Sequence, residues 1–424
     1  MMKNVFYDTC SLLILGDQLF EQEDTNIYIS SVTLRELEEI KTSDKKDADI
    51  KYAARHLLRT LDENNDRYTV VIYTESDTSE IIKKYDLPIN NDSKILALAY
   101  GFKNKQKLDD MYFCTNDLCL KSIANMFFDE EYIISADEEP KDNYTGFKEV
   151  TYTSDEELAG FYDKIFSPEA KETFGLNINE YLFIKSEDGV IIDKYKCNSE
   201  GVMLKIPYYK SESRMFGKIV PKDSYQTAAL DSFNTNVITM IQGRAGSGKS
   251  YLALGYLFEQ LEKRKIDKII VFCNTIAAQG AAKLGYYPGD KNDKLLDSQI
   301  GNMLSSKLGD RVEVERLIDD RKLLLLPLSD LRGFDTTGLN AGIYITEAQN
   351  MSIELMRLAL QRIGEDSICI IDGDTKHQVD SILYSGANNG MRRVSEIFRG
   401  CDYYGEIELQ NIYRSRIAKQ AELM

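Results

Sequence analysis

A chain of 424 residues, 43% of them hydrophobic, is long enough to form two or three domains with sizeable cores. Its net charge of −17 argues against a protein that holds nucleic acid through a general excess of positive charge. No run of eighteen apolar residues is present, so we expect no membrane span and no membrane partner. The start of the chain lacks the pattern of a signal peptide and the seven cysteines are scattered, which together predict a cytoplasmic location.

The first 135 residues alternate strand-like and helix-like segments, which predicts a parallel sheet covered by helices. The predicted strands are 5–7, 26–30, 68–74 and 111–115. The predicted helices are 33–41, 48–63, 77–85, 91–101 and 117–127. This part is acidic: residues 1–150 contain 30 Asp+Glu and 18 Lys+Arg, a balance of −12 that leaves −5 for the rest. Such acidity is compatible with a solvated surface or with a metal site built from carboxylates.

A polar stretch at 136–150 predicts a domain boundary. Short strand candidates separated by the turns "SEDG" and "NSEG" follow within 151–215, which indicates a small β-rich connector. From about residue 216 the alternation of strands and helices returns and continues to the end. We therefore predict three parts: 1–135, 136–215 and 216–424.

The strongest motif lies in the last part, between an apolar strand and an amphipathic helix, and it matches G-x-x-x-x-G-K-[ST]. Backbone N–H groups of such a loop converge on phosphates, and the helix N-terminus adds positive potential. The lysine is expected to reach the β- and γ-phosphates of ATP, and the serine to bind Mg²⁺. A glycine-rich turn that binds nothing is the alternative. The motif consists of Gly243, Arg244, Ala245, Gly246, Ser247, Gly248, Lys249 and Ser250.

A second stretch, "AGIYITEAQNM" at 341–351, is an apolar strand that ends at Thr346 and Glu347. We expect this strand to lie beside the phosphate-loop strand, with Glu347 orienting or deprotonating the attacking water. The position of Thr346 usually holds an aspartate that helps to bind magnesium in hydrolases of this kind. A hydroxyl there predicts weakened magnesium binding rather than an absent reaction.

Three further features fit an ATP-driven motor. Gln226 lies upstream of the phosphate loop, where a glutamine could bind adenine. Asp374, with Gln378 nearby, follows the strand 369–373 and is suited to sensing the γ-phosphate. Arg414 or Arg416 could contact nucleotide across a subunit boundary, although a surface role is the more common one for a single arginine.

These segments, together with "KLGYYPGD" (283–290), "LRGFD" (331–335) and "LQNIYRS", resemble the PhoH family of ATPases, which is related to superfamily 1 helicases. The resemblance covers about 216–420 and implies a homo-oligomeric ring, expected to be hexameric. The chain departs from the family pattern at Thr346, at "FCNTIAA" (272–278), which lacks the usual Arg-Pro, and at "GDTKHQ", which has one additional residue. These departures bear on the rate of turnover rather than on the fold.

Four acidic residues of the first part follow strands or begin helices, and such positions meet at one edge of an open α/β sheet. Gathered carboxylates repel one another unless a cation lies among them, and Mg²⁺ or Mn²⁺ prefers such ligands. An ion held there could activate water and stabilise a leaving phosphate oxygen. Helix capping, which contributes about 0.3–1 kcal/mol, is the alternative for each residue. The four are Asp8, Glu36, Asp92 and Asp117.

The stretches that carry these four residues resemble the PIN-domain ribonucleases over about 2–135. The resemblance implies that all four are catalytic metal ligands, supported by Thr115 and Asn116. Cys119 departs from the family, which often has a polar residue there.

Together the motifs predict an N-terminal PIN-like α/β/α domain, a small β-rich connector and a C-terminal P-loop (RecA-like) α/β ATPase domain. The expected function is ATP-dependent unwinding or threading of RNA coupled to metal-dependent cleavage, with ATP and Mg²⁺ or Mn²⁺ as cofactors. RNA is preferred to DNA only through the resemblance. Two alternatives stay open: an ATP-switched nucleic-acid binding protein with a silent nuclease site, and a ring scaffold that ATP stabilises.

Overall fold

The computed structural model describes residues 2–21, 24–43, 46, 48–136, 144–273, 299–309, 311–328, 331, 333–334, 336–379, 384 and 388–413. The chain forms two compact units. The N-terminal unit comprises 1–141 with 381–388, and the C-terminal unit comprises 142–380 with 389–424. Among the described residues, no helix is long and apolar enough to cross a membrane. The division at 135 and 215 stays a prediction.

The N-terminal unit contains a sheet of five parallel strands in the order β3-β2-β1-β4-β5. β1 lies at the centre because its residues are apolar on both faces: Val5 and Tyr7 pack on one side and Phe6 on the other. A strand buried on both faces needs helices on both faces. The strands are β1 (Lys3–Tyr7), β2 (Thr25–Ser30), β3 (Tyr68–Val71), β4 (Met111–Cys114) and β5 (Ile133–Ile134).

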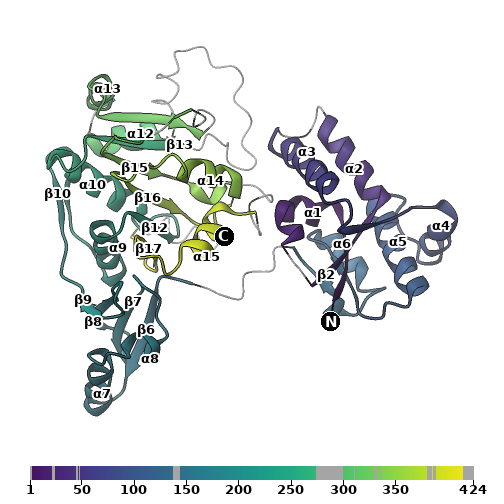
Figure 1. The fold of residues 1–424 in the computed structure, drawn as a ribbon, viewed down its shortest axis with the longest axis horizontal. Coiled ribbons are helices and arrows are strands. Elements are labelled where there is room, and N and C mark those ends of the chain that lie inside the picture. The colour runs from purple at the N-terminus through teal and green to yellow at the C-terminus, as the bar shows by residue number, and fades with distance from the viewer. Residues whose placement is uncertain are drawn as a thin grey trace. The chain divides into compact units, whose positions relative to one another are not determined.

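Helices cover both faces of this sheet, as Figure 1 shows, and this confirms the predicted α/β/α arrangement. α1 (Thr9–Leu15), η1 (Gly16–Phe20), α2 (Ser31–Thr42) and α3 (Ala48–Glu63) pack on one face. α4 (Glu75–Lys84), α5 (Asn91–Gln106) and α6 (Leu118–Ala124) pack on the other, and η2 (Glu130–Tyr132) precedes β5. The prediction that the helix at 91 ends at Gly101 was wrong, because the chain stays helical to Gln106 and leaves the helix at Lys107, with a positive φ of 54°.

The C-terminal unit is built on six parallel strands in the order β14-β13-β15-β16-β12-β17. One apolar core lies between this sheet and α9, α10, α12 and α13, and a second lies between its other face and α14 and α15. The strands are β12 (Ile238–Gly243), β13 (Lys268–Cys273), β14 (Leu323–Pro327), β15 (Ala341–Ile345), β16 (Ile368–Gly373) and β17 (Tyr404–Leu409). The helices are α9 (Ser224–Thr235), α10 (Lys249–Glu262), α12 (Gln299–Leu308), α13 (Arg311–Asp319), α14 (Ile353–Leu360) and α15 (Gly390–Phe398), with η4 (Ala348–Asn350) after β15.

The expectation that 341–345 lies beside the phosphate-loop strand was wrong. β16 lies between them, since Ile241 of β12 pairs with Asp372 of β16, and Ile345 of β15 pairs with Ile371. Parallel strands are joined by long crossovers, so the apolar pattern of a strand does not identify its neighbours. The consequence is that β16, rather than β15, brings its polar end directly beside the phosphate loop.

The connector contains the three strands expected from its sequence, but it also contains β6 and two helices that the sequence analysis missed. β6 pairs with β7 in parallel, and β7, β8 and β9 pair antiparallel. The side chain of Asn179 donates to the carbonyl of Tyr404 at 2.9 Å, and the Tyr181 hydroxyl donates to Asp231 at 2.9 Å, so the connector packs within the C-terminal unit. Its elements are β6 (Phe147–Tyr152), α7 (Asp155–Ile165), α8 (Ala170–Phe174), β7 (Tyr181–Ser186), β8 (Ile191–Cys197) and β9 (Met203–Lys205), followed by the hairpin β10 (Ser211–Ser213) and β11 (Gly217–Ile219).

Candidate active sites

A cavity of about 470 Å³ lies at the carboxyl edge of the N-terminal sheet, and all four sequence-predicted carboxylates line it. Parallel strands deliver their ends to this edge, and three of the four residues stand where a helix starts. The lining also contains Glu39 and, as its one described basic residue, Lys46. The cavity is therefore strongly acidic, and a negatively charged phosphate would be repelled from it unless cations were present.

Asp8 is the most deeply held of the four. It caps α1, accepting from the backbone N–H of Ser11 at 2.7 Å, and its other oxygen accepts from the Thr115 hydroxyl at 2.6 Å. Burial raises the pKa of Asp8 to about 6, against the lowering effect of these donors and with a smaller raising effect from Asp92. These hydrogen bonds fix the direction of the Asp8 carboxylate. Burial makes its charged form unfavourable, and a nearby cation would offset that cost.

Glu36 and Asp92 face the same cavity from α2 and α5. The Asn91 amide donates to Glu36 at 2.8 Å, and the Thr9 hydroxyl donates to its other oxygen. Burial raises the pKa of Asp92, and the neighbouring carboxylates of Glu36 and Asp117 raise it further. Glu36, Asp92 and Asp117 line the same cavity, so a cation bound there would relieve the repulsion between them.

Asp117 and its neighbours complete the cavity. Asp117 caps α6, accepting from the N–H groups of Cys119 at 2.7 Å and Leu120 at 2.9 Å. Asn116 accepts from the Ser11 hydroxyl at 3.2 Å and from the N–H of Ala136 at 2.8 Å. Capping is therefore real for Asp8 and Asp117, but it accounts for one oxygen of each, and it does not explain why four carboxylates share one cavity.

The donor set of the cavity suits a hydrated divalent ion. No three of the four carboxylates present oxygens within 4.8 Å of one another, although all four belong to the described part of the chain. Mg²⁺ is commonly held by one or two carboxylates and keeps several waters, so a wide acidic cavity fits it better than a tight cage would. Asp8, Glu36, Asp92 and Asp117 are the side chains that would hold such an ion.

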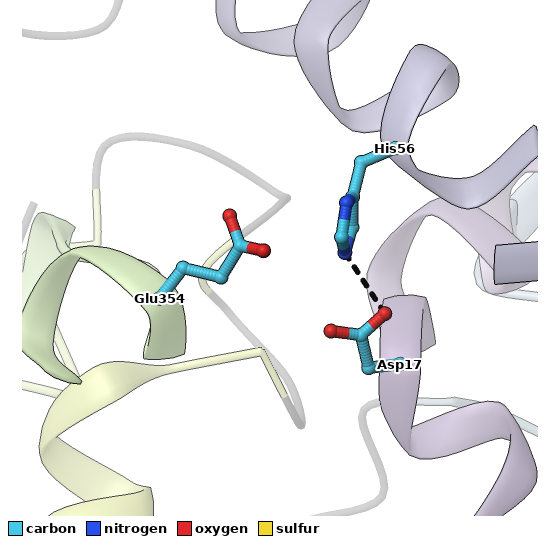
Figure 2. Close-up of side chains that lie close together, drawn as sticks. All are labelled: Asp17, His56 and Glu354. Atoms are coloured by element: carbon cyan, nitrogen blue, oxygen red, sulfur yellow. Dashed lines mark hydrogen bonds and ion pairs between the residues drawn. The ribbon is translucent and has the colours of Figure 1, made fainter. Parts of the chain in front are cut away.

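Figure 2 shows a separate polar pair in the N-terminal unit. His56 on α3 and Asp17 on η1 lie 2.9 Å apart, and the Thr60 hydroxyl donates to the same Asp17 oxygen at 2.9 Å. This pair ties α3 to η1. Glu354, also drawn there, belongs to the C-terminal unit.

The phosphate loop joins β12 to α10 in the C-terminal unit. Gly248 has a φ of 99°, and a Cβ on Gly243 would lie 2.8 Å from the carbonyl oxygen of Leu409, so both positions require glycine. The ammonium of Lys249 donates to the carbonyls of Gly243 and Arg244 within the loop. The N–H of Tyr413 donates to the carbonyl of Gly246 at 2.9 Å. The loop therefore holds a conformation that depends on glycine at two of its positions.

Gln226 lies against the phosphate loop, but its amide is engaged by protein at both ends. Its nitrogen donates to the carbonyl of Ser247 at 2.9 Å, and its oxygen accepts from the N–H of Lys222 at 2.9 Å. In this arrangement it supports the loop. Its role in binding adenine stays a prediction.

A polar cluster joins the loop to β15 and β16. The Ser250 hydroxyl donates to Asp372 Oδ2 at 2.9 Å, and the Tyr344 hydroxyl donates to the same oxygen at 2.6 Å. The backbone N–H of Glu347 donates to Asp372 Oδ1 at 3.2 Å. Asp372, which is 2% exposed, therefore fixes the predicted magnesium serine and the start of the turn that carries Glu347.

Glu347 has a φ of 52°, in the left-handed region that side chains other than glycine rarely adopt. Gln349 holds this turn: its nitrogen donates to Glu347 Oε2 at 2.7 Å, and its oxygen accepts from the N–H of Asp374 at 3.2 Å. A non-glycine residue held in this region commonly marks a functional position. Glu347 and Asp374 are thus joined through Gln349, and the Glu347 backbone reaches Ser250 of the phosphate loop through Asp372. Their roles toward a nucleotide stay predictions.

Two buried polar atoms near the loop have no hydrogen-bond partner among the described residues, and they are Ser247 Oγ and Asp374 Oδ2. Buried polar atoms are normally satisfied, so these two suit a polar ligand such as a nucleotide with its bound metal. Arg414 and Arg416 lie outside the described residues, as do the segment 283–290 and most of 272–278.

Sequence reasoning missed Gln349, Tyr344 and the pair Thr9–Asn91 as parts of the two sites. Gln349 and Tyr344 lie within the quoted stretch 341–351, and Asn91 precedes Asp92, so proximity to the motifs was the available signal. Their partners come from other strands and helices, which no local pattern identifies.

A P-loop sheet in one unit and an acidic cavity at a parallel-sheet edge in the other define the class of protein: a nucleotide-hydrolase domain joined to a nuclease-type domain. Residues 218–424 match the family model of the PhoH-like protein, and residues 5–127 match that of the PIN domain. The chain therefore belongs to the proteins in which a PIN domain is fused to a PhoH-like domain.

The similarity to curated relatives extends over nearly the whole chain. Protein PhoH2 of Bacillus subtilis is 25% identical over an alignment of 450 positions, gaps included, which covers 99% of each chain. Protein PhoH2 of Thermobispora bispora is 26% identical, covering 97% of this chain and 94% of the relative. Among solved structures, VapBC2 from Rickettsia felis bound to a promoter DNA fragment is 17% identical, covering 31% of this chain and 96% of that one. Its TM-score of 0.21 is too low for a structural argument.

Proposed function

We propose that the C-terminal unit hydrolyses ATP. The observation that carries this proposal is the convergence of three strand ends on one loop: Lys249 and Ser250 follow β12, Glu347 follows β15, and Asp374 follows β16. The loop N–H groups and Lys249 would bind the phosphates, and Glu347 would orient the attacking water. Arg414 would contribute positive charge from a neighbouring subunit.

Magnesium would be held at Ser250, where it would neutralise charge on the transferred phosphate. On nucleotide binding, the Lys249 ammonium would leave the loop carbonyls and contact the β- and γ-phosphates instead. Gln349 would keep the Glu347 carboxylate directed, since it binds one oxygen at 2.7 Å and is itself 1% exposed.

We further propose that the N-terminal cavity cleaves RNA with Mg²⁺ or Mn²⁺. Asp8, Glu36, Asp92 and Asp117 would hold the ion, which would supply an activated water and stabilise the leaving oxygen. The support is the raised pKa of Asp8 and Asp92 in an acidic cavity, because such carboxylates gain most from a bound cation. The nucleic acid is expected to be RNA on the strength of the PIN resemblance.

The joint function that we propose is ATP-dependent unwinding or threading of RNA, coupled to its cleavage, in a cytoplasmic hexameric ring. Incubation of the full chain with labelled single-stranded RNA and DNA, with and without ATP, in Mg²⁺ or Mn²⁺ tests it. Metal-dependent cleavage of RNA supports the proposal. ATP-dependent binding without cleavage would instead favour a nucleic-acid binding switch, and ATP-dependent assembly without either would favour a ring scaffold.

A further inference from the structure

The end of β15 carries a hydroxyl where hydrolases of this kind usually carry a magnesium-binding carboxylate. Thr346 is buried, with 4% of its surface exposed, and it lies two residues after Tyr344, whose hydroxyl donates to Asp372. The chain therefore has no anionic group at position 346, although Ser250 and Glu347 are in place around it.

The neighbouring strand carries a carboxylate at the corresponding place. Asp372 pairs with Ile241, and β16 lies directly between β12 and β15. Its Oδ2 lies 2.9 Å from the Ser250 hydroxyl, the group expected to bind magnesium. An anion in contact with this serine is well placed to attract an ion bound there, either directly or through a water.

The hydrogen bonds recorded for Asp372 within the described residues all come from neutral donors: two hydroxyls, of Ser250 and Tyr344, and the N–H of Glu347. No ion pair is recorded for it in the same part of the chain. A buried carboxylate normally requires a positive partner, because neutral donors only partly replace its hydration. A divalent ion at Ser250 would provide that positive partner.

We infer that Asp372 replaces, from the adjacent strand, the magnesium-anchoring carboxylate that is missing at Thr346. This inference rests on the proposed ATPase function and deepens it. Asp372 holds the ion or one of its waters, while Glu347 keeps its role toward the attacking water. An alternative function for Asp372 is purely structural, in fixing the Tyr344 hydroxyl and the Glu347 turn. The two functions differ in whether the Asp372 charge changes the response of nucleotide binding to magnesium.

The experiment measures the affinity of the full chain for a fluorescent ATP analogue, in Mg²⁺ and in EDTA, by anisotropy. This readout reports on the phosphate loop without requiring turnover and is separate from metal bound in the N-terminal cavity. In the parent, Mg²⁺ strengthens binding. In Asp372→Asn, the ratio of the affinity in Mg²⁺ to the affinity in EDTA falls by about 10- to 100-fold. Asp231→Asn is the control, because Asp231 is also buried, with 4% of its surface exposed, but it contacts Tyr181 and Lys196 rather than the loop.

A second variant exchanges the two positions. Thr346→Asp combined with Asp372→Thr returns one carboxylate to the end of β15, and it regains at least part of the magnesium response that Asp372→Asn loses. Asp372→Asn with a full Mg²⁺ gain, or a folded exchange variant with none, would overturn the inference and leave the proposed ATPase standing. A parent chain with the same nucleotide affinity in Mg²⁺ and in EDTA would overturn the inference alone, and a parent chain that binds no nucleotide would overturn both.

Discussion

The two carboxylate sites of this chain differ in what surrounds the negative charge. In the N-terminal cavity, Asp92 has a pKa raised by burial and by the charges of Glu36 and Asp117. In the C-terminal unit, Asp372 is enclosed by donors from Ser250, Tyr344 and the Glu347 backbone. The cavity is an open acidic site that gains from a cation, whereas the phosphate-loop site is already hydrogen-bonded into a fixed geometry. Variants in the cavity should therefore lose metal affinity and RNA cleavage, whereas variants in the phosphate-loop site should lose ATP turnover.

The largest effect is expected from Lys249→Ala, which should abolish the activity of the phosphate-loop site and leave the N-terminal cavity unchanged. ATP turnover should fall at least about 100-fold, because the remaining backbone N–H groups of the loop cannot supply a mobile positive charge to the γ-phosphate. Turnover by the purified variant is measured by phosphate release. Parent-like hydrolysis would show that the catalytic site lies elsewhere in the chain.

Glu347→Gln tests whether the Glu347 carboxylate acts on the attacking water in the phosphate-loop site. Turnover should fall about 100- to 10,000-fold, the range of general-base contributions, while binding of ATP persists. The amide is similar in size, so the Gln349 contact and the left-handed turn can survive. Turnover and nucleotide binding are measured on the same preparation, and undiminished turnover would remove Glu347 from the site.

Asp8→Asn removes one negative charge from the N-terminal cavity and leaves the side-chain volume nearly unchanged. The affinity for Mn²⁺ should fall about 10- to 100-fold, and cleavage of RNA at limiting Mn²⁺ should fall with it. Cleavage is followed across a Mn²⁺ titration, with ATP turnover as the internal control, since the phosphate loop lies in the other unit. Equal cleavage by variant and parent would leave capping of α1 as the explanation of Asp8.

The smallest effect concerns stability. Glu406 is buried beside the phosphate-loop strand, accepting from Gln242 at 2.7 Å and Tyr404 at 2.9 Å, and burial raises its pKa to about 7. Folding raises this pKa because the neutral carboxyl group is favoured in the folded chain. The contribution of Glu406 to the free energy of unfolding is therefore complete below its unfolded pKa of about 4.5, and it is lost as pH rises through about 7. The parent should lose about 1 kcal/mol of stability between pH 6 and 8 from this group.

Glu406→Gln should show less of this pH-dependent loss. Denaturant unfolding of the C-terminal unit at pH 6 and pH 8, for parent and variant, makes the comparison. An unchanged pH dependence in the variant would mean that Glu406 does not titrate in this range.

Local motifs made much of both sites predictable from the sequence. The phosphate loop needs consecutive residues, and the four cavity carboxylates follow from the rule that parallel strands end at one edge. Asp372 could not be placed beside Ser250 in the same way, because the pairing of β12 with β16 joins segments about 130 residues apart. The helices α7 and α8 were missed because they are short and lie among predicted strands. Their buried residues in the connector core include Ile165 and Ala170.

The proposal that most needs testing is that ATP hydrolysis in one unit serves RNA cleavage in the other. Its most direct test is cleavage, in Mn²⁺ and with or without ATP, of an RNA whose only long single-stranded segment is a tail, the rest being a stable hairpin. We expect the parent to cut within the hairpin only when ATP is present, and Lys249→Ala to cut the tail alone. Hairpin cleavage at the same rate without ATP, or by Lys249→Ala, would contradict it.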